Sequence, residues 1–391
     1  ITIITIIEDI KVYNPKYLGI KTIVLAGDKI EGIYDKVKVP EDFITIRRIN
    51  GRGKACLPGF IDSHVHIIGG GGEGGFGTRT PEINVKTLIE SGITSVVGCL
   101  GTDSVCRNME TLLAKANALE DVITAYCYTG SYDIPVKTLT GSIKKDVILI
   151  EKIIGVGEIA LSDHRSTQPT YDEFIRAVSE TRVGGLLSGK AGIVNIHLGD
   201  GKKRLDYLFK MIEETEIPTT QVLPTHLNRS KQLLNEGLRY AKKNGYIDLT
   251  TSSDPKHLEP EEMRASEALA YLLSKGVNIE NITFSSDGNG SMPVFDKGKL
   301  LGLGICNVSS LYGEVKEAVK QYNIPMETAI KVITSNVAEL LKLKNKGFVE
   351  VGKDADLVII DDKDLKIDSV IAKGKIVVEN GKAIIDSIFA Y

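Results

Sequence analysis

The middle of the chain repeats one pattern eight times, a short strand-like run followed by a longer helix-like stretch. The runs are rich in Ile, Val, Thr and Tyr, and the stretches place apolar residues at helical spacing. The runs are residues 59–66, 94–100, 124–130, 158–163, 192–198, 220–226, 246–252 and 281–287. Eight strands, each followed by a helix, predict an α/β protein with a (β/α)8 barrel, the TIM barrel architecture.

The two ends of the chain differ from this middle part. In residues 1–56 and 346–391, apolar and polar residues alternate, and glycine-containing turns separate short segments such as ITIITII and GKIVVENG. Alternation with a period of two is typical of antiparallel strands that bury one face. We therefore predict that the two ends together form one small β-sandwich domain, and that residues 57–345 form the barrel.

Composition narrows the class of protein. The chain has 391 residues, of which 42% are hydrophobic and 25% charged, as in ordinary soluble domains. The net charge of −3 gives no reason to expect nucleic acid or an anionic membrane as a partner. There is no long apolar run, and the start lacks the layout of a signal peptide. The five scattered cysteines, without a CxxC pair, favour buried, reduced thiols in the cytoplasm.

Most of the six histidines stand at the ends of predicted strands. His64 and His66 are two residues apart, so both side chains point to the same face of the first strand. An HxH pair alone would equally suit two ordinary polar residues. However, His197 closes the fifth strand, His226 the sixth and Asp287 the eighth. The carboxyl ends of barrel strands meet at one rim, so these five side chains predict a metal site.

Several sequence blocks carry a resemblance to a known family. PGFIDSHVH, the later single histidines, SSDG and GKDADLVIID resemble the amidohydrolase superfamily over nearly the whole chain. Further blocks are similar to the isoaspartyl dipeptidases within it, namely HVHIIGGGGEGGFGTRTPE, GTDSVCRN, TGSYDIP, SDHRS, NIHLGDG, LPTHLNRS and SSDGNGSMP. This resemblance implies a metal-dependent enzyme that hydrolyses β-aspartyl (isoaspartyl) dipeptides. It also implies a large homo-oligomer, an octamer.

The resemblance implies a site with two divalent ions. We expect Zn2+ because His and carboxylate ligands suit it, and Co2+, Mn2+ and Ni2+ are the alternatives that the same ligand types allow. The implied ligands are His64, His66, His197, His226 and Asp287, with a bridging carboxylate from the fourth strand. That carboxylate is usually a carboxylated lysine, which this chain lacks. Counting back from SDHRS gives Glu158 at the position, and counting forward from IIGV gives Gly157. Glu158 offers two carboxylate oxygens and is the chemically sensible bridge, while a single-ion site beside Glu158 is the alternative.

Two bridged ions would lower the pKa of a shared water and supply a bridging hydroxide. Asp287 would take its proton and pass it to the leaving amine. The resemblance gives Tyr132 the stabilisation of the oxyanion, although a loop tyrosine alone more often packs.

Charged residues near the strand ends suit a zwitterionic diacid as substrate. Glu73 follows four glycines and could pair with the α-ammonium group, while Arg165 and Arg229 offer forked donors to the carboxylates. A single arginine there would equally suit a surface ion pair. The substrate positions implied by the resemblance are Glu73, Thr102, Arg165, Arg229 and Ser291.

Two other functions share parts of the pattern. A cyclic-amide hydrolase of the dihydroorotase or hydantoinase type would keep the His and Asp ligands, but it would not need the acidic loop after the glycines. A catalytically inactive scaffold should have lost some ligands, and here all of them are present. His164 is expected to orient its neighbours, and His257 has no assigned role.

Overall fold

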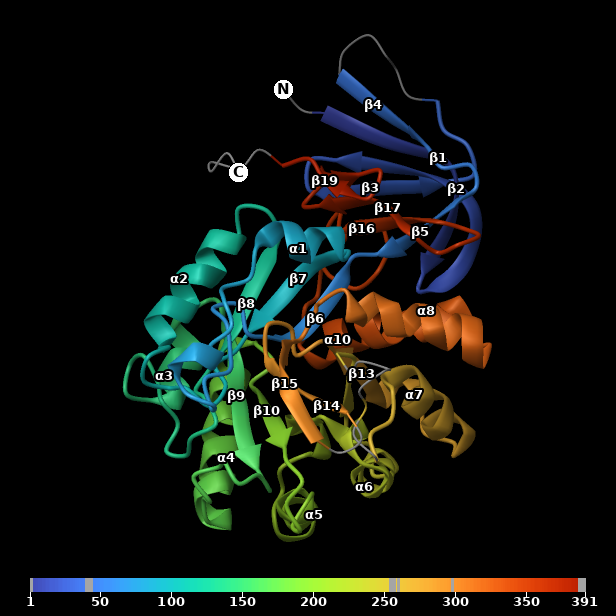
Figure 1. The fold of residues 1–391 in the computed structure, drawn as a ribbon. Coiled ribbons are helices and arrows are strands. Elements are labelled where there is room, and N and C mark those ends of the chain that lie inside the picture. The colour runs from blue at the N-terminus through green and yellow to red at the C-terminus, as the bar shows by residue number, and fades with distance from the viewer. Residues whose placement is uncertain (1–2, 39–44, 253–257, 259–260, 297–298, 386–391) are drawn as a thin grey trace.

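The computed structural model describes residues 3–38, 45–252, 258, 261–296 and 299–385. Strands from both ends of the chain lie together at one end of the molecule, and the alternating strands and helices of the middle part form the rest (Figure 1). The terminal strands are β1 (Ile3–Asn14), β2 (Lys16–Ala26), β3 (Lys29–Tyr34), β4 (Thr45–Asn50), β5 (Lys54–Pro58), β16 (Leu357–Asp361), β17 (Ile367–Ala372), β18 (Lys375–Glu379) and β19 (Lys382–Ala383).

These terminal strands form a nine-stranded sheet in the order β19-β18-β17-β16-β5-β1-β2-β3, and β4 pairs with β1. The two ends of the chain meet where β5 pairs with β16, for example Leu57 with Val358. Apolar side chains from both ends, among them Ile7, Ile23 and Ile359, pack in one buried cluster. The terminal segments therefore fold as one unit.

The described residues of the middle part contain eight parallel strands, and each overlaps one predicted run. They are β6 (Phe60–Val65), β7 (Ile93–Gly98), β8 (Thr124–Thr129), β9 (Ile153–Leu161), β10 (Ile193–Leu198), β11 (Val222–Thr225), β12 (Ile247–Thr250) and β13 (Ile282–Ser285). Strands β6 to β11 form one curled sheet, and β12 pairs with β13. The amide N–H of His66 also donates to the carbonyl of Gly288 at 2.8 Å, which links the end of β6 to the segment after β13.

Helices follow the strands, as the pattern predicts (Figure 1). They are α1 (Val85–Glu90), α2 (Met109–Leu119), α3 (Ile143–Leu149), α4 (Tyr171–Ser188), α5 (Asp206–Glu214), α6 (Lys231–Ala241), α7 (Ala265–Ser274), α8 (Ser310–Tyr322), α9 (Met326–Ala329) and α10 (Ser335–Leu340). In α4, Thr170 and Glu173 form a capping box, and Gly189 ends the helix in the left-handed conformation. No helix among the described residues is long and apolar enough to cross a membrane.

Two features differ from the sequence prediction. Strand β9 begins at Ile153, whereas the predicted run began at residue 158. The prediction started too late because two glycines inside the strand resemble a turn signal. A Cβ at Gly155 would lie 2.2 Å from the carbonyl oxygen of Ile193, so glycine here permits close strand packing. The hairpin of β14 (Ser291–Asp296) and β15 (Lys299–Ile305) was not predicted.

Candidate metal centre and substrate cavity

The predicted metal ligands stand at the carboxyl ends of the parallel strands. His64 lies in β6, His66 directly follows it, and His197 lies in β10. His226 and Asp287 follow β11 and β13, both in the left-handed backbone conformation with φ of 65° and 53°. His and Asp adopt that conformation more readily than most residues. All these side chains except Asp287 are buried, so the strand ends direct them into the protein.

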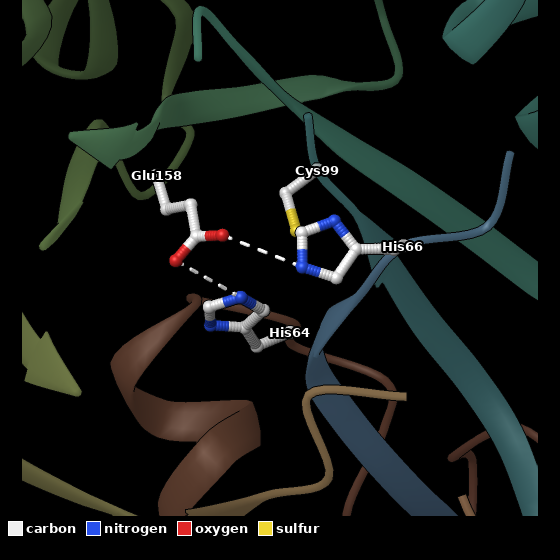
Figure 2. A group of neighbouring side chains, drawn as sticks. All are labelled: His64, His66, Cys99 and Glu158. Carbon is white, nitrogen blue, oxygen red and sulfur yellow. Dashed lines mark hydrogen bonds and ion pairs between the residues drawn. The ribbon is translucent and has the colours of Figure 1, made fainter. Parts of the chain in front are cut away.

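Glu158 in β9 is the common neighbour of two groups of histidines. Its Oε2 lies 3.2 Å from His64 Nε2, and its Oε1 lies 3.4 Å from His66 Nε2 (Figure 2). On the other side, Oε2 lies 3.2 Å from His197 Nδ1 and 3.8 Å from His226 Nε2. One carboxylate therefore faces both halves of the candidate site.

The structure also decides between the two registers of the fourth predicted strand. A Cβ at Gly157 would lie 2.8 Å from Cβ of Asn195, so this position is packed against β10. The side chain of Glu158 is the one that points to the histidines. Asp287 completes the group, with its Oδ1 3.0 Å from His66 Nε2 and 3.6 Å from His64 Nε2.

The donor atoms suit divalent metal ions. Both ring nitrogens of His64 and Nε2 of His226 are buried and make no hydrogen bond with a described residue. Such atoms are rare in folded proteins unless another ligand completes them. Burial, together with the neighbouring His197, lowers the pKa of His226 to about 3, so its imidazole is neutral. Imidazole nitrogens and carboxylate oxygens are donors that suit Zn2+, and the residue types present therefore fit the implied ions.

Charge on the bridging group follows from its neighbours. Burial alone would raise the pKa of Glu158, but the imidazoles of His64 and His197 hold that pKa well below its usual value. The group is therefore an ionised carboxylate, the form in which it can bind cations.

A cavity of about 690 Å3 opens beside the histidines. All five predicted substrate residues line it, namely Glu73, Thr102, Arg165, Arg229 and Ser291. Asp287 and Tyr132 line it as well, and so does His164. His257 lies outside the described residues. The structure thus brings the predicted metal ligands and the predicted substrate residues to one place.

Glu73 is held at the cavity wall by polar neighbours. Thr102 Oγ1 donates to its carboxylate at 2.8 Å, and Ser291 Oγ donates at 3.4 Å. Arg165 Nη1 lies 3.4 Å away. The glycines before Glu73 make this loop possible: Gly69 has φ of 81°, and a Cβ there would lie 2.3 Å from the carbonyl oxygen of Thr80.

Tyr132 and Arg165 are joined to the metal centre through His197. Tyr132 Oη lies 2.9 Å from His197 Nδ1, and Arg165 Nη2 lies 3.0 Å from His197 Nε2. Asp163 accepts two hydrogen bonds from the Arg165 guanidinium, at 2.8 and 3.0 Å, and its Oδ2 also lies 3.0 Å from His197 Nε2. Burial raises the pKa of Tyr132 well above its usual value, so the phenol keeps its proton.

Two residues of the site were not among the predicted ones. Asp163, whose position at the end of the fourth predicted strand suits a helix cap or a residue that supports the ligands, orients both an arginine and a histidine. Cys99 is the other: its sulfur lies with donor atoms of His64, His66 and Glu158, all within 4.8 Å of one another. It directly follows β7 at the same rim, whereas a cysteine in an apolar run is normally interpreted as packing.

Comparisons with known proteins identify the family. The amidohydrolase family model matches residues 55–377. The chain is 22% identical to an adenine deaminase of Clostridium acetobutylicum over 95% of this chain, but it spans only 61% of that protein's length. It is 24% identical to a dihydroorotase of Pyrococcus horikoshii, over 80% of this chain and 72% of that protein.

Solved structures give a more specific result. The β-aspartyl dipeptidase of Fervidobacterium islandicum AW-1, solved in complex with the dipeptide β-Asp-Leu, is 43% identical with a TM-score of 0.92 over 99% of both chains. A dihydropyrimidinase of Brevibacillus agri NCHU1002 shares the fold, with a TM-score of 0.68 at 17% identity over 97% of this chain and 96% of that one. The chain therefore belongs to the amidohydrolase family and, within it, groups with the β-aspartyl dipeptidases.

Proposed function

We propose that this protein hydrolyses β-aspartyl (isoaspartyl) dipeptides in a metal-dependent reaction. The observation that carries the proposal is the charge pattern of the cavity, where Glu73 stands with Arg165 and Arg229 beside the histidine cluster. A β-aspartyl dipeptide carries one ammonium and two carboxylates next to its scissile amide, so its charges complement this wall. The likeness to a β-aspartyl dipeptidase solved with β-Asp-Leu supports the same substrate class.

The metal centre would hold two divalent ions, which we expect to be Zn2+. Glu158 would lie between them, because its carboxylate faces both groups of histidines. The remaining ligands would be His64, His66, His197, His226 and Asp287. When bound, such ions lower the pKa of a water that they share and so make hydroxide available at neutral pH.

Asp287 would move the proton. Its carboxylate lies beside the HxH pair and also lines the cavity, so it can accept a proton from the nucleophilic water and then donate it to the leaving amine. Tyr132 would donate its hydroxyl hydrogen to the oxygen of the scissile carbonyl as negative charge develops there. The raised pKa of Tyr132 keeps that hydrogen in place, and its hydrogen bond with His197 holds the ring beside the metal centre.

Glu73 and the two arginines would fix the substrate's orientation. Without substrate, Glu73 pairs with Arg165, so an arriving ammonium would exchange partners with that guanidinium. Asp163 keeps Arg165 at the wall during this exchange through its two hydrogen bonds. Arg229 donates one hydrogen bond to the carbonyl oxygen of Leu198, which leaves other donors of its guanidinium available for a substrate carboxylate.

Metal analysis combined with an activity assay tests the proposal. We expect about two Zn2+ per chain and cleavage of β-Asp-Leu, with no cleavage of α-Asp-Leu or dihydroorotate. Preference for dihydroorotate would instead establish the cyclic-amide hydrolase function, which is the activity that the name of the dihydroorotase relative states. Cleavage of β-Asp-Leu with one ion per chain would keep the substrate and remove Glu158 as a bridge.

We extend the proposal to the architecture. The eight parallel strands would close into a barrel, with the contact between His66 and Gly288 at the seam, and the terminal strands would fold as a sandwich. A homo-octamer stays a prediction of the family resemblance, and a cytoplasmic location stays a prediction from the scattered cysteines. Light scattering of the purified protein measures the first, and cell fractionation the second.

A further inference from the structure

Cys99 occupies a position that the proposed ligand set does not use. Four buried side chains place their donor atoms within 4.8 Å of one another, namely His64, His66, Cys99 and Glu158 (Figure 2). We propose that the Cys99 sulfur is a ligand of the ion held by the HxH pair. The proposal rests on the metal-dependent function proposed above and gives that site a sulfur donor.

The backbone fixes Cys99 beside the first strand. Cys99 directly follows β7 and is fully buried, and its amide N–H donates to the carbonyl of Val65 at 3.0 Å. Val65 stands between the two histidines in the sequence, so Cys99 lies level with the pair. Two residues further on, a Cβ at Gly101 would lie 3.0 Å from His66 Cε1. The chain thus runs directly along the histidine cluster.

The donor atoms lie close enough to converge on one ion, since one ligand atom of each of the four residues lies within 4.8 Å of the others. His66 turns Nε2 toward Glu158 at 3.4 Å and Asp287 at 3.0 Å, so Nε2 is its donor to the shared ion. The Cys99 sulfur lies 3.9 Å from Nδ1 of the same ring, so the two side chains must shift for the sulfur to reach that ion. In a tetrahedral zinc site, with Zn–N of about 2.0 Å and Zn–S of about 2.3 Å, the nitrogen and sulfur lie about 3.5 Å apart.

A second observation favours a ligand over simple packing. His64 is fully buried, and neither of its ring nitrogens makes a hydrogen bond with a described residue. An ion beside His64 would complete one of these nitrogens, and the Cys99 sulfur belongs to the same cluster of donor atoms. The Cys99 sulfur also lies 3.7 Å from the carbonyl oxygen of Val65, which is a weak interaction for a thiol.

The proposal has a chemical consequence for Asp287. His66 has a candidate metal ligand near each ring nitrogen, namely Asp287 beside Nε2 and Cys99 beside Nδ1. On binding, the Cys99 thiol releases its proton and the sulfur bonds to the ion, so the site gains one negative charge. Sulfur ligation makes Asp287 less necessary as a ligand and leaves its carboxylate free to carry the proton. A thiolate also favours Zn2+, Cd2+ and Co2+ over Mn2+ and Mg2+.

Cobalt spectroscopy on the full chain tests the proposal. We expect the Co2+-loaded protein to show a sulfur-to-cobalt charge-transfer absorption in the near ultraviolet, and Cys99→Ser and Cys99→Ala to lose it. Cys127→Ser is the matched control, because Cys127 is equally buried in the neighbouring strand β8 but lies outside the cluster, and it should keep the absorption. Retention of the absorption in both Cys99 variants would overturn the proposal.

X-ray absorption of the zinc-loaded parent protein keeps the test independent of how the variants fold. A sulfur scatterer at about 2.3 Å supports the proposal, and nitrogen and oxygen alone at about 2.0–2.1 Å overturn it. Metal content and β-Asp-Leu cleavage are measured on the same sample. Cleavage without a zinc–sulfur contact would refute the Cys99 ligand and leave the proposed function intact, whereas a protein that binds no metal would refute both.

Discussion

Glu158 is the residue whose replacement tests the two-ion centre most directly. Its carboxylate is 1% exposed and faces imidazoles on both sides. Replacement by Gln keeps the size of the side chain but removes its negative charge. Each bound ion would then lose the carboxylate that it shares with the other, and the variant would place two cations close together with one negative charge fewer between them.

The expected size of the effect follows from the burial. Removing one partner of a buried charge pair costs about 3–5 kcal/mol. Since 1.4 kcal/mol corresponds to a factor of ten, Glu158→Gln should weaken metal binding by roughly two to three and a half powers of ten. We expect hydrolysis of β-Asp-Leu to fall with the metal content.

Competition between the protein and a chromophoric chelator measures this affinity, and elemental analysis gives the number of ions per chain. Glu314→Gln is the control, because Glu314 on α8 is also a buried carboxylate, which accepts hydrogen bonds from Arg264 and Ser266. The control should lose thermal stability and keep both ions. If Glu158→Gln binds two ions as tightly as the parent protein, the carboxylate does not bridge them.

Four further predictions concern other residues. Asp287→Ala should lower kcat by about 10²–10⁴-fold with an unchanged far-ultraviolet spectrum; near-normal turnover would remove Asp287 from proton transfer. N-acetyl-β-Asp-Leu should resist cleavage because Glu73 would have no ammonium to bind, and equal turnover of both peptides would contradict this. Lys346→Met should unfold at a lower temperature, because Nζ of the buried Lys346 lies 2.5 Å from Asp356 Oδ2 and breaking a buried ion pair costs about 3–5 kcal/mol of folding free energy. An unchanged melting temperature would argue against a stabilising role of this ion pair. Burial raises the pKa of Glu120, but hydrogen bonds from lysines outweigh this effect, so the pKa is lowered overall. The stability that Glu120 contributes is therefore present above the usual glutamate pKa and is lost as the pH falls through the lowered pKa. The Glu120→Gln variant should lack this pH-dependent loss of stability during acid unfolding.

Strand ends were predictable because their signal is local. Apolar runs of the right length mark the strands, and the polar residue that closes each run marks its carboxyl end. Parallel strands bring those ends to one rim, so His197 and His226, which are far from His64 in the sequence, could be placed beside it without coordinates. The distances around Glu158 show that they do lie together.

Contacts made across the rim were harder to predict. Asp163 lies 3.0 Å from His197, and this depends on how the loop after β9 turns, which no periodic pattern encodes. Cys99 has the same difficulty, because a cysteine in an apolar run satisfies the pattern of a core residue equally well. The hairpin of β14 and β15 was missed because its strands follow a polar, glycine-containing segment that is typical of a loop.

The fourth strand shows how packing settles a choice that the sequence leaves open. Gly157 has no room for a side chain against Asn195, so only Glu158 can enter the site. From that position a glutamate is long enough, since its Oε2 already lies 3.2 Å from both His64 Nε2 and His197 Nδ1. A carboxylated lysine would be several atoms longer and would overpack the same buried space. The spacing of the strands around Glu158 therefore matches the shorter side chain. A lysine in place of Glu158 should not support the metal centre, even if it is carboxylated.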